Sequence, residues 1–215
     1  MGDLKAAEEL WGNLAYSQIL NVEDETIRAI KTLGLKASTV PQLMAEARKV
    51  VSGRGLDITP FKELLEKYVD EEKIRSSPCD LYVTSLSVTD RREVVFDVKQ
   101  ARSGTIKDVL LASAFFPAFK NEKLGGKTYL DGGMVNNVPV DVLAERGYKN
   151  LIVIRIYGIG VDTERRTELP EDVNVYRIAP RRNLGGILEF EKKRTRRSMT
   201  LGYFDARRLL YGLAG

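Results

Sequence analysis

The stretch KTYLDGGMVNNVPVDVLAERGYKNLIVIRIY, residues 127–157, predicts the fold of this chain. KTYLD is a short strand between glycine pairs. Pro139 suits the first turn of a helix that reaches Arg146, and Gly147 is a typical C-terminal stop. NLIVIRIY, at 150–157, is a nearly continuous apolar run, typical of a strand buried on both faces. This alternation of strand, helix and strand predicts an α/β protein with helices on both faces of a parallel sheet.

The segments on either side extend this prediction. A β-branched run over 80–88, a polar turn and a second run over 93–98 indicate a hairpin. Apolar residues at helical spacing and proline or glycine at the boundaries indicate the other elements. The predicted helices cover 4–11, 23–33, 41–51, 60–69, 105–116 and 187–211, and a further strand covers 173–179. We therefore expect one domain over 1–215, with 1–77 mainly helical and 78–215 forming the α/β part.

Composition excludes several chemistries. The chain has 215 residues, no histidine and one cysteine, Cys79. It therefore holds no Ser-His-Asp triad, no histidine-ligated zinc and no internal disulfide. No EF-hand-like acidic cluster indicates calcium, and we expect neither a metal nor an organic cofactor. No apolar run is long enough for a signal peptide or a membrane helix, which predicts a cytoplasmic protein.

Positive charge is concentrated near the C-terminus. Residues 177–208 hold ten Lys or Arg and three Asp or Glu, although the whole chain carries only +4. Such a segment is consistent with a solvated helix face, with an anionic membrane or with nucleic acid. No nucleic-acid motif accompanies it, so we expect no nucleic-acid partner.

Asp131 is the candidate site residue. It ends the predicted strand, and Gly132 and Gly133 after it allow a tight turn with close backbone approach. Functional groups in α/β folds gather at the carboxyl ends of strands. The same three residues also fit an Asp-Gly turn without any chemistry.

Three segments taken together resemble the patatin-like family of lipid acyl hydrolases. They are ASAFFPAF (112–119), YLDGGMVNNVPVDVLAERG (129–147) and NLIVIRI (150–156), in that order. The resemblance implies a three-layer fold with a mainly parallel sheet covered by helices. It also implies a Ser–Asp dyad in which Asp131 is the base, supported by Gly132 and Gly133. Such a dyad needs no histidine and no cofactor, and its substrates are acyl esters of lipids.

Two parts of the family's machinery are absent from these 215 residues. The chain contains no GxSxG nucleophile elbow and no glycine-rich oxyanion loop. Acyl transfer needs a nucleophile, a base and oxyanion donors, so we expect the chain to be inactive alone. We interpret it as the C-terminal part of such a hydrolase, missing its N-terminal strands, with Met1 an internal methionine of a longer reading frame. The alternative is a non-catalytic patatin-like binding module. The basic C-terminal helix predicts peripheral contact with an anionic membrane.

Overall fold

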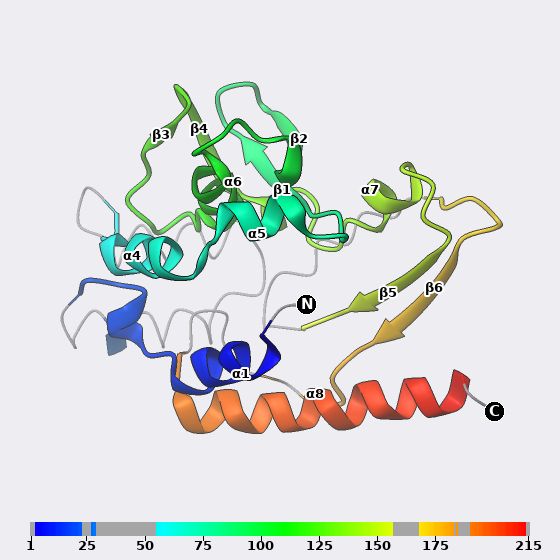
Figure 1. Cartoon of the computed structure of the whole chain (residues 1–215). Coiled ribbons are helices and arrows are strands. Elements are labelled where there is room, and N and C mark those ends of the chain that lie inside the picture. Colours follow the sequence, from blue (N-terminus) through cyan, green and yellow to red (C-terminus); the bar gives the residue numbers. More distant parts are fainter. Residues whose placement is uncertain are drawn as a thin grey trace.

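The computed structural model describes residues 3–22, 27–28, 55–156, 168–182, 184 and 190–213. Within these ranges the protein is a mixed α/β structure with two separate sheets and helices around them (Figure 1). The predicted helices over 23–33 and 41–51 lie outside the described residues, apart from residues 27–28.

The main sheet is antiparallel. Its strand order is β2-β1-β4-β3, and every neighbouring pair in it runs antiparallel. The predicted hairpin is confirmed as β1 and β2, and the predicted KTYLD strand is β4. The strands are β1 (Tyr82–Ser87), β2 (Arg92–Asp97), β3 (Lys123–Leu124) and β4 (Lys127–Asp131).

The prediction of a mainly parallel sheet is wrong for the described residues. The parallel arrangement is limited to β5 (Asn150–Ile154) and β6 (Asn174–Ile178), which form a separate two-stranded sheet. Both edges of β4 are occupied, one by β1 and the other by β3, so β5 cannot pair with β4 as a βαβ unit would require. The chain leaves β4 through α7 (Val140–Ala144) and enters β5, which pairs with β6 instead.

The prediction that both faces of β5 are buried is also wrong. Leu151 and Val153 are buried, whereas Ile152 is 57% exposed and Ile154 is 69% exposed. The side chains of a strand alternate between its two faces, so one face of β5 packs against the protein. The other face is open to solvent.

Five of the six described helices correspond to predicted helices, whereas the helix over residues 71–76 was not predicted. The described helices are α1 (Leu4–Asn13), α4 (Thr59–Tyr68), α5 (Glu71–Ser76), α6 (Ile106–Ala114), α7 and α8 (Lys192–Leu213). Helix α8 continues through Gly202 without a break. Gly147 has a φ of 87°, which only glycine adopts readily, and it ends the turn after α7.

The larger core lies around α6 and the segment that follows it. Phe115 and Ala112 are almost completely buried there, together with Leu20 and Ile58 from the N-terminal part of the chain. A parallel bridge between Leu56 and Phe119 connects the two parts of the chain. This packing fixes the C-terminal end of α6, where the backbone turns toward β4.

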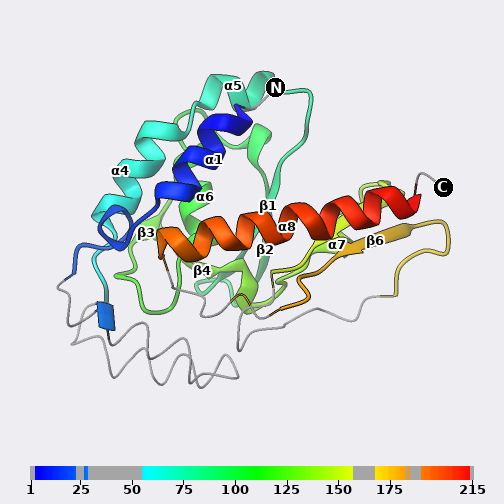
Figure 2. The same ribbon diagram turned by 90° about the horizontal axis from the view of Figure 1, so that it is seen from below.

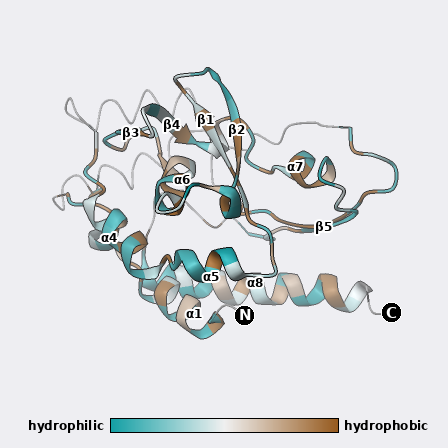
Figure 3. Ribbon diagram, turned by 45° about the horizontal axis from the view of Figure 1, so that its top comes forward, coloured by the Kyte–Doolittle hydropathy of each residue, from teal (hydrophilic) through white to brown (hydrophobic). Residues whose placement is uncertain are grey.

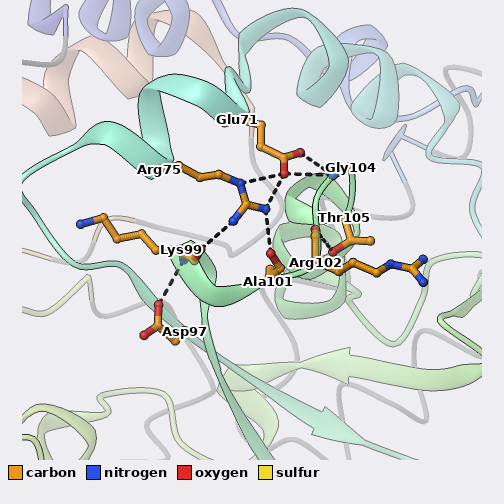
Figure 4. A network of polar contacts seen from close by, with 8 residues as sticks. All are labelled: Glu71, Arg75, Asp97, Lys99, Ala101, Arg102, Gly104 and Thr105. Carbon is orange, nitrogen blue, oxygen red and sulfur yellow. Dashed lines mark hydrogen bonds and ion pairs between the residues drawn. The ribbon is translucent and has the colours of Figure 1, made fainter.

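A polar cluster attaches α5 to the connection between β2 and α6 (Figure 4). The Arg75 guanidinium donates to the carbonyl oxygens of Lys99 at 2.6 Å and Ala101 at 2.7 Å. Glu71 pairs with Arg75 at 2.5 Å and accepts the backbone N–H of Gly104 at 2.9 Å. These bonds hold the loop that begins α6 in one position.

Candidate active site

Asp131 lies at the end of β4, between the main sheet and α6. Its Cα pairs with that of Ser85 in the β1–β4 register. Its backbone N–H donates to the carbonyl oxygen of Phe115 at 2.8 Å. Because Phe115 is fully buried in the core, the candidate base is held by the backbone that leaves α6.

Gly132 must be glycine because its backbone touches β1. A Cβ at this position would lie 2.3 Å from the carbonyl oxygen and 2.4 Å from the Oγ1 of Thr84. Gly133 is also restricted, since its Cβ would lie 2.9 Å from Oδ1 of Asn137. The two glycines let a short turn, η3 (Gly132–Met134), press against the sheet directly after Asp131. The prediction of a tight turn with close backbone approach is confirmed.

The Asp131 carboxylate is partly buried, and one of its two oxygens accepts a hydrogen bond. Oδ1 accepts the backbone N–H of Gly133 at 2.7 Å. Within the described ranges, Oδ2 has no hydrogen-bond partner. Burial raises the pKa of the Asp131 carboxyl, because the charged form loses hydration, and the Gly133 hydrogen bond acts in the opposite direction. The result is an oriented carboxylate with a raised pKa, one oxygen of which has no partner among the described residues.

Asn136 and Asp141 support the turn, and the sequence analysis gave neither a role. The side-chain amide of buried Asn136 donates to Asp141 Oδ1 at 2.9 Å and to Glu93 at 3.1 Å. Its backbone N–H donates to the carbonyl oxygen of Gly132 at 2.9 Å. Asn136 therefore connects the glycine turn to α7 and β2. The sequence carried no local signal for this role, because the burial of Asn136 and its need for partners become visible only in the folded structure.

The hydroxyl groups of the serines near Asp131 are hydrogen-bonded to groups other than Asp131. Ser85 is fully buried, and its Oγ lies 2.8 Å from both the Ala112 and the Leu130 carbonyl oxygens. Ser87 is also buried and donates to Asp90 at 2.9 Å. In the part of the chain that the structure describes, no serine hydroxyl is hydrogen-bonded to Asp131.

The described residues form neither a metal centre nor a membrane-spanning helix. No three Asp, Glu or Cys side chains of the described residues gather closely enough to hold a metal ion. Among the helices that the structure describes, none is long and apolar enough to cross a membrane.

Fold and site together define a mixed α/β protein that holds a partly buried carboxylate at the end of a strand. A comparison with family models is more specific. The patatin-like phospholipase model matches residues 3–144, well over half of the chain. The chain belongs to the patatin-like phospholipase family, which confirms the resemblance seen in the sequence. A search of curated proteins gives no match.

Proposed function

We propose that this chain supplies the catalytic base of a lipid acyl hydrolase. The observation that carries the proposal is the Asp131 carboxylate, oriented by Gly133 and with its second oxygen free among the described residues. Family membership supports lipid esters as the substrate class. The raised pKa supports a role in proton transfer, because a stronger base accepts a proton more readily.

The nucleophile in this proposal is a serine on a GxSxG segment that the 215 residues do not contain. Asp131 accepts the hydroxyl proton of that serine while the serine oxygen forms a bond to the ester carbonyl carbon. As the tetrahedral intermediate collapses, the ester C–O bond breaks and the proton passes to the leaving alcohol. Water then attacks the acyl-serine with Asp131 again as base, which releases the fatty acid and restores the serine.

A complementation assay tests this proposal. A GxSxG-bearing N-terminal segment from an active family member is co-expressed with the chain, and hydrolysis of a p-nitrophenyl ester is measured. We expect turnover from the pair and none from the chain alone. Asp131→Asn should lower kcat of the pair by about 10²–10⁴-fold, the usual contribution of a general base.

The matched control is Asp172→Asn. Asp172 is an exposed carboxylate in an ion pair with Lys149 at 2.6 Å, next to the other sheet. This variant should keep the activity of the pair. The proposal is wrong if the Asp131→Asn pair remains as active as the wild-type pair. It is also wrong if the pure chain hydrolyses the ester through Asp131 without any added segment.

A non-catalytic binding module is the second candidate function. The observation that favours it is the absence of a GxSxG serine from the sequence, together with the commitment of Ser85 and Ser87 to other partners. Under this alternative, the complemented pair shows no turnover and no serine is labelled by a fluorophosphonate, although both segments fold and associate.

A further inference from the structure

The outward face of α8 carries positive charge and no negative charge. Six basic residues of this helix are exposed: Lys192, Lys193, Arg196, Arg197, Arg207 and Arg208. The helix has one acidic residue, Asp205, which is 6% exposed. At about 100° per residue, the exposed positions fall on one side of the helix, and Asp205 falls on the other.

Large apolar and aromatic side chains share this face with the basic residues. Tyr203 is 61% exposed and Tyr211 is 65% exposed, and Phe204 and Leu210 are also more than half exposed. The Arg207 guanidinium lies over the Tyr211 ring at 5.0 Å. Hydrophobic and hydrophilic residues alternate along the helix in Figure 3. Exposed aromatic rings next to arginines are typical of a surface that contacts a partner.

Contacts at both edges of the exposed face attach α8 to the rest of the protein. The exposed Arg196 donates to the carbonyl oxygen of Gly12 in α1 at 3.2 Å, so its charge is not free for a partner. Asp205 accepts from Arg181, just after β6, at 3.0 Å, and from Arg208 at 3.1 Å. In Figure 2, α8 lies across the near side of the molecule, in front of the other elements. The basic and aromatic side is therefore presented outward on a fixed helix.

We propose that the exposed face of α8 docks on the surface of an anionic lipid bilayer. Four of the exposed cations, Lys192, Lys193, Arg197 and Arg207, form no ion pair within the described part of the chain and complement the negative surface potential of such a membrane. Tyr and Trp rings concentrate at the boundary between headgroups and acyl chains, where one end of the ring stays hydrated. Leucine and phenylalanine side chains insert into the same boundary. This docking does not depend on catalysis.

A flotation assay tests the docking with vesicles of ether-linked lipids, which contain no acyl ester to hydrolyse. Vesicles of neutral phosphocholine lipid are compared with vesicles in which about a third of the lipid is anionic phosphoglycerol. The full chain should float with the anionic vesicles only, and added salt should release it. Because these lipids have no cleavable ester, the outcome is independent of whether the chain supplies a catalytic base.

A pair of double variants locates the docking face. Lys193→Gln with Arg197→Gln removes two charges from α8 and should lower the partition coefficient about 30-fold, from about 1 kcal/mol per charge. Lys67→Gln with Lys123→Gln removes two exposed charges elsewhere and should change it less than about 2-fold. Tyr203→Ser with Phe204→Ser should weaken binding without changing its dependence on salt. Circular dichroism checks that each variant is folded.

Three results would overturn the proposal. The first is equal binding of the chain to neutral and anionic vesicles. The second is equal loss of binding in the α8 variant and the Lys67 and Lys123 control. The third is retention of the chain by RNA or DNA at a salt concentration at which it no longer floats with anionic vesicles, which would assign the face to nucleic acid.

Discussion

Because Gly132 lies in close contact with β1, we expect one added methyl group at this position to lower the free energy of unfolding substantially. In Gly132→Ala the new Cβ would lie 2.3 Å from the Thr84 carbonyl oxygen, whereas real Cβ atoms essentially never approach closer than 3.0 Å. The turn or the strand must therefore move by at least about 0.7 Å. Overpacking of this kind costs about 1–3 kcal/mol, and weakened hydrogen bonds between β1 and β4 add about 1 kcal/mol each. We expect a total loss of about 2–4 kcal/mol.

Urea denaturation measures this loss. With an m-value of about 2 kcal/mol/M, a loss of 3 kcal/mol lowers the midpoint by about 1.5 M. Removing the Thr84 hydroxyl in the double variant Gly132→Ala with Thr84→Ala should restore little, because the backbone oxygen remains. Gly202→Ala is the matched control, since its Cβ meets nothing within 4 Å and alanine favours a helix. A Gly132→Ala midpoint within about 0.2 M of wild type would refute the steric reasoning.

Two further predictions concern pH. The Thr59 hydroxyl and backbone N–H lower the pKa of Asp57 to about 2, below its usual 3.8. The folded state therefore binds this proton less readily than the unfolded state, and the resulting stability is present above about pH 4 and lost as the pH falls toward 2. The stability advantage of wild type over Asp57→Asn in urea titrations should shrink over that range, and a constant difference would contradict the assignment. The effect of Asp131 on the pH dependence of stability is opposite to that of Asp57, because burial raises the pKa of Asp131. Its ionisation destabilises the fold as the pH rises above the usual 3.8 and through the raised pKa, so Asp131→Asn should gain stability relative to wild type as the pH rises above about 4, and an unchanged difference would exclude this effect.

Local elements were predictable because short-range rules determine them. The hairpin followed from two β-branched runs around a polar turn, and the stop after α7 followed from Gly147. The antiparallel arrangement of the strands in the main sheet was not predictable in this way. The pattern of strand, helix and strand after residue 127 does not reveal that β1 and β3 already occupy both edges of β4. That information lies in contacts between segments far apart in the sequence.

The wrong prediction that both faces of β5 are buried has a similar origin. An apolar run indicates a buried strand, but burial also depends on which element covers each face. For the candidate site, the sequence predicts Asp131 and its glycines from their order and from the family resemblance, and this remains a prediction. Asn136 and Asp141 were missed, because their role appears only when the turn folds back on α7. Residues with a local role were therefore easier to predict than residues that join separate elements.

The hydrogen bond from Asp131 to the Phe115 carbonyl has a consequence for genetics. In a screen for lost activity of the complemented pair, substitutions at positions 115, 116, 118 and 119 should appear beside substitutions at the site itself, although these side chains belong to the core. Protein abundance separates the two groups. Core variants lose activity in proportion to the protein that remains in the cell, because unfolded chains are degraded. The proposed role as base predicts that Asp131→Asn lowers the activity of the complemented pair per molecule while its abundance stays normal.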